Sequence, residues 1–302
     1  MTNILLLFIC FIIGILLRMV PTLPENTPRA LNFYIIYVAL PATTVLFVKT
    51  ITFEPALIIA VLAEWMLVFM AIGLFNIIGK KAGFSKAIIG CLIITTGLGN
   101  TSFIGFPMIE AFYGKKLMGI GIMYNQLGTF LVLSTVGILI ATRYSGFEFN
   151  KSRMLKKIFT FPPLLSLIAG LALIPVKYPD MVKVILKRLS GTLAPIALIS
   201  VGMMINFKSM RKNLAKISIG VVYKLILGPA VLLTIFAFIF GVRGSVLQIT
   251  IFEAAMAPMI TGGIIAEMYG LDPELASGIL GVGIPLSFAT LFLWFEILKY
   301  FV

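Results

Sequence analysis

The chain has 302 residues, of which 60% are hydrophobic and 12% are charged, and its mean hydropathy is +1.11. A soluble domain carries about 25% charged residues, so this composition excludes an ordinary soluble protein. The net charge of +13 comes from Lys and Arg beside apolar stretches, a pattern typical of membrane topology, and it does not indicate nucleic-acid binding. Since the chain has no histidine, a histidine proton relay is excluded, and neither a metal site nor a cofactor is predicted.

Apolar stretches long enough to cross a hydrocarbon core of about 30 Å follow one another along the chain. Backbone groups in lipid must find hydrogen-bond partners within the protein, so these stretches predict helices, and the alternating pattern of a membrane barrel is absent. We predict an all-α membrane protein with ten transmembrane helices. The predicted spans are residues 3–20, 30–48, 54–79, 86–113, 117–142, 157–175, 181–205, 213–240, 245–269 and 273–300.

The distribution of Lys and Arg among the connections predicts the orientation. The connections on one side of the predicted membrane hold more basic residues, notably near residues 80–86 and 143–157. By the positive-inside rule that side is the cytoplasm. We therefore predict a multi-pass protein of the cell inner (plasma) membrane with both termini extracytoplasmic. Lys183, Lys187 and Arg188 weaken the bias unless they lie on an amphipathic start of the seventh helix.

Three predicted spans each contain one deep ionisable residue: Glu64 in the third, Lys224 in the eighth and Glu253 in the ninth. Such a residue costs about 2.5 to 3.5 kcal/mol at a helix centre, so each should face the protein interior. One hypothesis is that Glu64, with Glu253 and Lys224, links proton or cation binding to helix movement. The alternative is a structural ion pair that joins the third and eighth or the eighth and ninth helices.

The fourth predicted span contains three glycines, a proline and several hydroxyl-bearing residues within residues 95–107. Proline removes a backbone donor and glycine permits an unwound segment. Irregular backbone at this depth occurs only inside protein or beside a water-filled cavity. We predict a helix break here, in which Asn100, Thr101 and Ser102 donate hydrogen bonds to an anion and Gly105 allows close backbone approach.

The ninth predicted span has a matching interruption around Pro258 and residues 254–263. If both broken helices cross, two half-helix N-termini meet, and their free N–H groups and partial positive charges form an anion site. The alternative for each break is a proline kink that serves helix packing. Two breaks at matching positions favour the functional interpretation.

The two halves of the chain resemble each other. Pro41 precedes Phe53 by the same interval as Pro195 precedes Phe207, and a Tyr-Gly pair ends both the fourth and the ninth span. An odd number of helices per half inverts the second half in the membrane, as in many secondary transporters. The predicted organisation is a first five-helix repeat at 1–143, a cytoplasmic linker at 144–156 and a second, inverted repeat at 157–302. Chance coincidence of Pro and Gly is the alternative.

Four motifs together resemble the auxin efflux carrier family, which includes the plant PIN carriers and bacterial permeases for malonate and malate. The resemblance extends over all ten predicted helices. The motifs are NTSFIGFPMIEAFYG at 100–114, KLILGPA at 224–230, EAAMAP at 253–258 and YGLDPEL at 269–275. The resemblance implies a fold similar to sodium/proton antiporters and bile acid transporters, with a scaffold of helices 1, 2, 6 and 7, a moving transport domain of helices 3–5 and 8–10, and a homodimer. The linker is short, so the regulation that plant carriers exert through a long loop is not expected.

The resemblance also implies roles for individual residues. Asn100 matches an asparagine that meets the substrate carboxylate, Pro107 and Pro258 match the crossover prolines, and Gln126 matches a polar residue facing the same site. Glu64 matches an acidic residue in a support site beside the crossover. Helix 9 departs from the plant pattern, because Glu253 and Met259 stand where plant carriers have glutamine, and this puts the aromatic-ring pocket of the auxin carriers in doubt.

These residues predict a secondary transporter of small organic anions (carboxylates) that works by elevator-type alternating access, with a proton or sodium ion as candidate coupling ion. The expected partners are a small carboxylate, the lipid bilayer and a second copy of the chain, with no nucleic acid. The alternative is a cation/proton antiporter of similar fold that uses Glu64 and Glu253. A membrane-embedded enzyme is disfavoured because no span holds a carboxylate pair, and a receptor that does not transport would not need two matched breaks.

Overall fold

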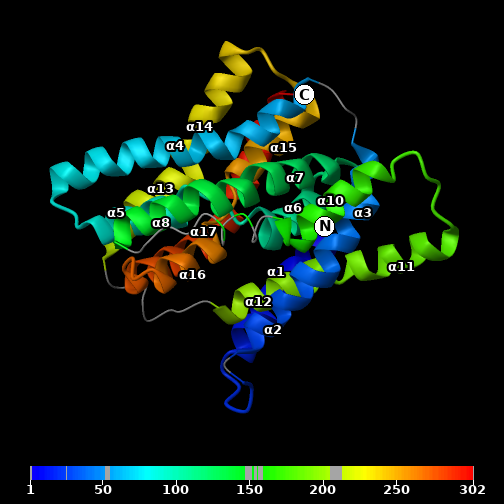
Figure 1. The fold of residues 1–302 in the computed structure, drawn as a ribbon, viewed down its shortest axis with the longest axis horizontal. Coiled ribbons are helices and arrows are strands. Elements are labelled where there is room, and N and C mark those ends of the chain that lie inside the picture. Colours follow the sequence, from blue (N-terminus) through cyan, green and yellow to red (C-terminus); the bar gives the residue numbers. More distant parts are fainter. Residues whose placement is uncertain are drawn as a thin grey trace. The chain divides into compact units, whose positions relative to one another are not determined.

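The computed structural model describes residues 2–24, 26–51, 55–146, 152, 155, 159–204 and 213–301, and the secondary structure of these residues is helical (Figure 1). The chain forms two compact units. Unit 1 comprises residues 1–53, 102–122 and 158–205, and unit 2 comprises residues 54–101, 123–157 and 206–302. The chain passes from unit 2 to unit 1 after Thr101, within a single predicted span.

Unit 1 is held together mainly by close contacts between helices. The helix α1 packs lengthwise on α12, and a Cβ atom on Gly202 would lie 2.3 Å from the Phe11 carbonyl oxygen, so only glycine fits there. The helix α3 packs against α10 and α11. The elements of this unit are α1 (Thr2–Leu17), α2 (Thr27–Tyr34), η1 (Ile35–Ala39), α3 (Leu40–Phe47), η2 (Val48–Thr50), η3 (Thr101–Gly105), α6 (Phe106–Phe112), η4 (Lys115–Leu117), α7 (Met118–Met123), α10 (Pro162–Ala172), α11 (Asp180–Gly191) and α12 (Leu193–Met204).

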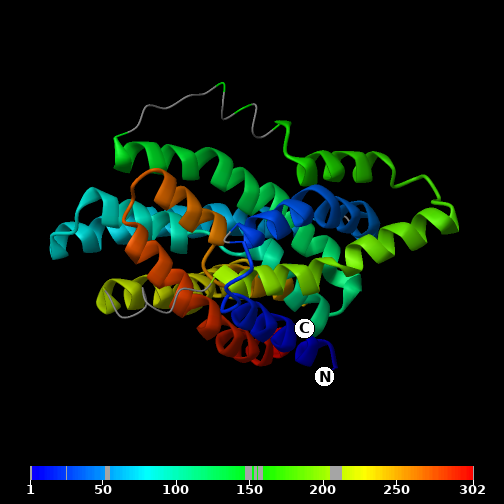
Figure 2. The same cartoon turned by 90° about the horizontal axis from the view of Figure 1, so that it is seen from below.

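Unit 2 is built around the long helix α4, which packs against α5, η5, α14 and α15. The helix α16 covers α5 and turns back into α17 (Figure 2), and α17 packs against α13. The elements of this unit are α4 (Leu57–Ala82), α5 (Lys86–Thr96), η5 (Tyr124–Phe130), η6 (Leu133–Gly137), α8 (Ile138–Ser145), α13 (Leu214–Val222), η8 (Tyr223–Leu227), α14 (Gly228–Leu233), η9 (Thr234–Ile239), α15 (Gly244–Ala254), α16 (Ile260–Met268), α17 (Pro273–Leu298) and η10 (Lys299–Phe301).

The helix α4 exposes apolar residues on one face and buries a charged residue on the other, the reverse of an amphipathic helix in a soluble protein. Ile58, Leu62 and Phe69 are exposed, and so is Ile77, although all are large and apolar. Exposed apolar residues at intervals of about one or two turns suit a face that contacts lipid. The opposite face is buried and carries Glu64 among small and apolar residues. The polar residue is therefore inside and the apolar stripe is outside.

Several helices contain π-helical segments, in which the hydrogen bonds widen by one residue. In η8 the cause is local, because Pro229 has no N–H to donate to the carbonyl one turn earlier. That carbonyl, on Leu225, accepts a hydrogen bond from Trp294 Nε1 at 2.8 Å. The segment η8 also contains Lys224, and η5 contains Tyr124 and Gln126. Segments of this kind are frequent at functional sites.

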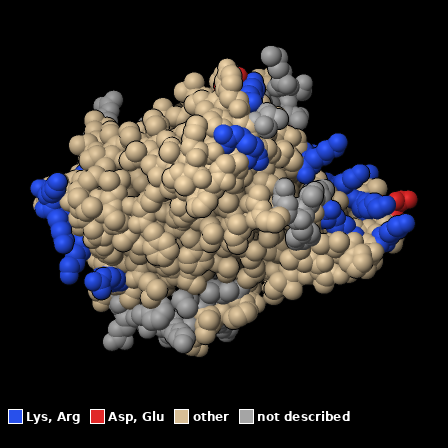
Figure 3. Space-filling model, turned by 90° about the horizontal axis from the view of Figure 1, so that it is seen from above, with Lys and Arg blue, Asp and Glu red and all other residues tan. Residues whose placement is uncertain are grey.

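Six helical stretches of the described chain are long and apolar enough to cross a membrane, which confirms a multi-span helical protein. They are Thr27–Phe47, Leu57–Ala82, Lys115–Ser145, Asp180–Met204, Leu214–Ile239 and Pro273–Phe301. Three shorter apolar helices, Phe8–Leu17, Lys86–Thr96 and Pro162–Ala172, lie within other predicted spans. The count of ten spans stays a prediction. In Figure 3, Lys and Arg gather in a few groups, and uncharged residues make up most of the other described surface.

Some sequence predictions need correction or lie outside the described residues. Within the predicted span at 157–175, the helix α10 runs from Pro162 to Ala172, and two prolines at its start fix where this helix begins. Lys183, Lys187 and Arg188 do lie in an amphipathic helix, α11. Phe53 and Phe207, used to align the repeats, lie outside the described residues, as does most of the predicted linker at 144–156.

Candidate functional site

Two interrupted helices meet in unit 2. The helix α5 ends at Thr96, α15 ends at Ala254, and α16 begins at Ile260. The two intervening segments, residues 97–100 and 255–259, are hereafter the paired breaks. Asn100 N donates to the Ala257 carbonyl at 2.8 Å, and Met259 N donates to the Thr95 carbonyl at 3.1 Å. The first break thus finds a backbone partner in the second, and the second finds one in the last turn of α5, as buried backbone groups require.

Glycine and proline at the paired breaks explain why the sequence forms them. Pro258 cannot donate a backbone hydrogen bond, so α15 cannot continue through it. A Cβ atom at Gly283 of α17 would lie 2.5 Å from the Pro258 ring, so glycine there makes room for the proline. A Cβ atom at Gly262 would lie 2.5 Å from the Ile94 carbonyl oxygen, which shows how closely α16 approaches α5. Both breaks lie where the sequence predicts them.

Glu64 of α4 stabilises the first break. Its side chain is fully buried, and its Oε1 atom accepts a hydrogen bond from the Gly99 backbone N–H at 2.6 Å. Its Oε2 atom accepts a hydrogen bond from the Tyr124 hydroxyl at 2.7 Å. Hydrogen bonds to a charged acceptor are short and about twice as strong as neutral ones. Glu64 therefore fixes both an unwound backbone and the π-helical segment η5.

Lys224 of η8 stabilises the second break. Its Nζ atom, fully buried, donates to the Ala254 carbonyl at 3.0 Å. That carbonyl is at the C-terminal end of α15, where the helix dipole favours a cation. A Cβ atom on Gly99 would lie 2.9 Å from Lys224 Nζ, so the ammonium group packs directly against the first break. One acidic and one basic side chain thus both contact the first break, and the basic one also binds the end of α15.

Glu253, in the last turn of α15, is as buried as Glu64 and Lys224 but differs from them in its hydrogen bonding. Neither of its carboxylate oxygens has a hydrogen-bond partner among the described residues. Its charge interacts with those of Glu64 and Lys224 at a distance. The structure corrects the ion-pair alternative, since no ion pair in the described part of the chain joins Lys224 to Glu64 or Glu253.

A network of uncharged polar side chains continues from the first break. Asn125 Nδ2 donates to Thr101 Oγ1 at 2.7 Å, and Thr101 Oγ1 donates to Thr129 Oγ1 at 3.1 Å. Gln126, one residue further along η5, is fully buried, and Asn100 is 3% exposed. Amides and hydroxyls can either donate or accept, so this network can adapt to a carboxylate.

The structure assigns the predicted site residues to both units. Those in unit 2 are Glu64, Asn100, Thr101, Gln126, Lys224, Glu253, Pro258 and Met259. Ser102, Gly105 and Pro107 belong to unit 1, where Pro107 lies in the first turn of α6 and Gly105 precedes that helix. Thr101 is tied to η5 by hydrogen bonds, and Met259 to α5 by its backbone.

Four residues of the site, Gly99, Tyr124, Asn125 and Thr129, were not predicted from the sequence. Three of these lie in the segment Tyr-Asn-Gln-Leu-Gly-Thr of η5, which is unusually polar for a membrane helix. That local composition was a usable signal. The partnership of Gly99 and Tyr124 with Glu64 had no sequence signal, because the three residues lie on separate elements.

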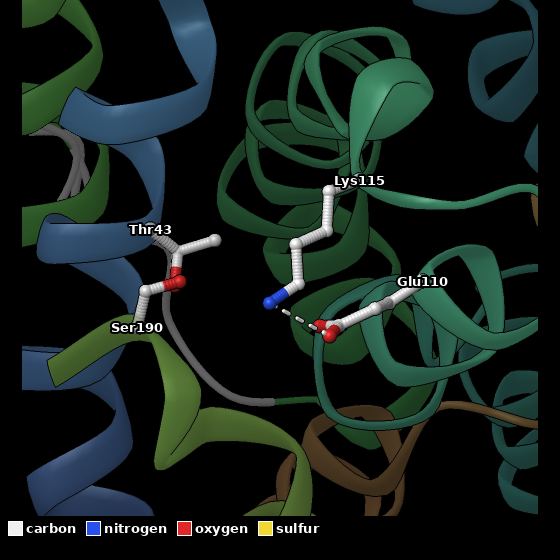
Figure 4. Close-up of polar contacts among 4 residues, drawn as sticks. All are labelled: Thr43, Glu110, Lys115 and Ser190. Carbon is white, nitrogen blue, oxygen red and sulfur yellow. Dashed lines mark hydrogen bonds and ion pairs between the residues drawn. The ribbon is translucent and has the colours of Figure 1, made fainter. Parts of the chain in front are cut away.

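The polar contacts of unit 1 are of another kind (Figure 4). Lys115 of η4 forms an ion pair with Glu110 of α6 at 3.1 Å, and both side chains are partly exposed. Thr43 of α3 donates to the Ser190 hydroxyl of α11 at 3.0 Å and to the Ala39 carbonyl at 2.7 Å. These contacts join elements of the unit without burying a charge.

No group of His, Cys, Asp and Glu in the described parts of the chain could hold a metal ion. What the fold and the site define is a polytopic membrane protein with paired breaks and buried ionisable residues, a combination typical of secondary transporters.

The comparison with known proteins agrees with this class. Residues 1–295 match the family described as "Membrane transport protein", and the chain belongs to that family, which confirms the resemblance to the auxin efflux carriers. The chain is similar to an uncharacterized transporter of Methanothermobacter thermautotrophicus, 24% identical over 98% of this chain and 97% of that protein. It is also similar to an uncharacterized transporter of Methanocaldococcus jannaschii, 24% identical over 97% of each protein.

Proposed function

We propose that this membrane transporter is a secondary carrier of small organic anions, and that a carboxylate binds at the paired breaks. The observation that carries the proposal is the pairing of the two breaks through two backbone hydrogen bonds, one from Asn100 to Ala257 and one from Met259 to Thr95 in the last turn of α5. This pairing brings Gly99 and Asn100 of one break to Pro258 and Ala257 of the other, and Thr101 directly follows the first break. Irregular backbone with amide and hydroxyl side chains is the usual substrate site of such carriers.

The charge around the paired breaks supports a small anion as substrate. Lys224 provides one ammonium group, and the N-terminus of α16 adds the partial positive charge of a helix dipole. Asn100, Thr101 and Gln126 supply uncharged polar groups in a buried setting. The contributions of Ser102, Gly105 and Pro107 to anion binding stay predictions.

The proposed mechanism is elevator-type alternating access with ten spans in two inverted repeats whose broken helices cross. Unit 2 contains the predicted helices 3, 8, 9 and 10, most of helix 5 and the first half of helix 4, which supports a transport domain made of these elements. Unit 1 contains the predicted helices 1, 2, 6 and 7 with the second half of helix 4, which supports a scaffold. We propose that two copies dimerise and that both termini are extracytoplasmic.

A cation/proton antiporter of the same fold is the second candidate, and Glu253 is the observation that favours it. A fully buried carboxyl group without a hydrogen-bond partner among the described residues is suited to bind a proton. Against it, Glu64 has both oxygens occupied by protein donors. Anion transport accounts for more of the buried side chains, because amide and hydroxyl groups can donate hydrogen bonds to a carboxylate.

The test is uptake of labelled mono- and dicarboxylates and of labelled sodium into proteoliposomes, with and without a pH gradient. Asn100→Ala should reduce carboxylate uptake at least tenfold, the loss of about 1.4 kcal/mol of binding energy, while the protein still elutes as a folded dimer. The control is Asn26→Ala, because Asn26 is exposed in a connection of unit 1. Sodium uptake without any carboxylate uptake would replace this proposal with the antiporter.

A further inference from the structure

Glu253 is the one buried carboxyl group of the described chain that the fold leaves without a hydrogen bond. Placing an ionised carboxylate in such surroundings costs several kcal/mol, whereas the protonated form costs no more than another neutral polar group. Glu64 lies in the same unit and is equally buried, but a backbone N–H and a tyrosine hydroxyl compensate its charge. The two carboxyl groups therefore differ in how the surrounding protein compensates a negative charge.

Among the described residues, Glu253 forms neither a hydrogen bond nor an ion pair with its neighbours. The titratable side chains that interact with it electrostatically are Glu64 on α4, Lys224 on η8 and Tyr124 on η5. Lys224 donates to a backbone carbonyl and Tyr124 donates to Glu64. The helix α14 has no titratable residue, and α15 has none besides Glu253.

The remaining elements packed on α15 add no compensating charge. From α17 and η10, Glu296 and Lys299 form an ion pair with each other on the exposed surface. Glu274 lies at the exposed start of α17. Lys80 and Lys81 lie in the last turn of α4, more than four turns from Glu64.

We infer that Glu253 is the proton-binding residue of the transport cycle and that it carries a proton when the anion is bound. This inference rests on the proposed function as an anion carrier. When the site opens to water, the O–H bond of the Glu253 carboxyl breaks, the proton passes to water, and a carboxylate remains near the Lys224 ammonium. Uptake of a proton from water on the other side reverses the step.

The charge balance at the site determines the direction of coupling. With Glu253 protonated, the charges of Glu64 and Lys224 cancel, and an incoming anion meets no net negative charge. With Glu253 ionised, the same region carries one net negative charge and repels the anion. Binding of the proton therefore strengthens binding of the anion, and binding of the anion strengthens binding of the proton to the same extent. The carrier then moves both in the same direction.

Infrared spectroscopy of the purified full chain tests the protonation state without any ligand. At neutral pH we expect a protonated-carboxyl absorption in wild type, in Glu64→Gln and in Glu267→Gln, and its loss in Glu253→Gln. Glu267 is the matched control, because it is an exposed glutamate on α16. Retention of this absorption in Glu253→Gln, or its loss in Glu64→Gln alone, would overturn the inference.

Thermal melting supplies a readout that separates protonation from a structural role. Glutamine has the shape of a protonated glutamate, so Glu253→Gln should melt at the wild-type temperature at neutral pH. A clearly lower melting temperature would indicate that an ionised Glu253 stabilises Lys224, which contradicts the inference.

Uptake of labelled malonate into proteoliposomes tests the coupling. Wild type should take up malonate faster when the outside is acidic, whereas uptake by Glu253→Gln should not respond to the external pH. Acceleration by acid in Glu253→Gln equal to wild type would refute the coupling role. If wild type transports no carboxylate, the proposed function fails, and the infrared result still decides the state of Glu253.

Discussion

The two compact units bury different kinds of side chain. Unit 2 buries the charged residues Glu64, Lys224 and Glu253 together with the amides of Asn100, Asn125 and Gln126. In the described part of unit 1 the buried polar side chains are hydroxyls only, on Thr43, Thr44, Ser166 and Ser200. The close glycine contacts differ in the same way. Gly202 meets a backbone carbonyl oxygen of α1, whereas Gly99 meets the Lys224 ammonium.

This difference indicates which unit carries the chemistry. Burying charge costs stability that hydrophobic packing would not, so a membrane protein retains it where function requires it. Unit 1 uses apolar packing and close helix contacts, as expected of a rigid support. Unit 2 buries charged side chains at a cost in stability, as expected of the part that binds ligand. Five predictions test this comparison, from the largest expected effect to the smallest.

Glu64→Ala should lower the free energy of unfolding by about 3 kcal/mol, because it leaves the Gly99 N–H and the Tyr124 hydroxyl buried without their acceptor. Reversible unfolding in mixed micelles measures this change. Glu267→Ala, an exposed change on α16, should stay within about 0.5 kcal/mol of wild type. A loss below about 1 kcal/mol for Glu64→Ala would show that the buried charge is not structural.

Gly202→Ala should lower the free energy of unfolding by about 2 kcal/mol, because the new Cβ atom would lie 2.3 Å from a backbone oxygen of α1 and would force the helices apart. The same micelle titration applies. Gly191→Ala is the control, since a Cβ atom there meets nothing within 4 Å. Equal stability of the two variants would contradict the view that unit 1 is held by close packing.

Gly99→Ala should lower the free energy of unfolding by about 1.5 kcal/mol, since the added methyl displaces Lys224 Nζ from the Ala254 carbonyl. Gly99→Ala should also reduce carboxylate uptake in the molecules that remain folded, because the Lys224 ammonium group moves away from the paired breaks. Gly73→Ala on α4 meets nothing within 4 Å and should leave both unchanged. Normal uptake by Gly99→Ala would separate Lys224 from the anion site.

Trp294→Phe should cost about 1 kcal/mol, because it removes the donor to the Leu225 carbonyl that Pro229 leaves free. Differential scanning fluorimetry with an external dye measures the change. Trp65→Phe should cost less, because its bond to the Leu127 carbonyl is longer, at 3.3 Å, and only partly buried. A larger loss of stability in Trp65→Phe than in Trp294→Phe would show that the Leu225 carbonyl, which Pro229 leaves free, does not need a hydrogen bond from Trp294.

Lys115→Ala should change the free energy of unfolding by at most about 0.5 kcal/mol, because its ion pair with Glu110 is partly exposed and screened by water. Chemical unfolding at low and high salt measures the effect, which should vanish at high salt. A loss as large as that of Glu64→Ala would erase the distinction between the units.

Local sequence patterns predicted much of the fold. Apolar stretches predicted helices, and Gly and Pro predicted interruptions within residues 95–107 and 254–263, because both residue types act on the backbone directly. The breaks of the structure are shorter, because Thr101–Gly105 is a π-helical segment and α16 begins at Ile260. Glu64, Lys224 and Glu253 were predictable as interior residues from the sequence, because charge is rare in apolar surroundings. Each of the three is fully buried.

The pairing of these residues was not predictable from the sequence. An ion pair between Lys224 and a carboxylate was one expectation, whereas Lys224 donates to the Ala254 carbonyl and Glu64 accepts from Gly99 and Tyr124. Hydrogen-bond partners depend on which segments approach within about 3 Å, and residue type does not set that distance.

By itself the sequence determined that this protein is helical, spans a membrane and interrupts two helices, because these properties depend on hydropathy and on backbone chemistry at single residues. The tertiary structure decided that Glu64 is committed to the fold while Glu253 is left without a hydrogen bond among the described residues. The physical reason is that the cost of a buried carboxylate is set by the donors that surround it. The donors to Glu64 come from η5 and the first break, which only folding brings to α4.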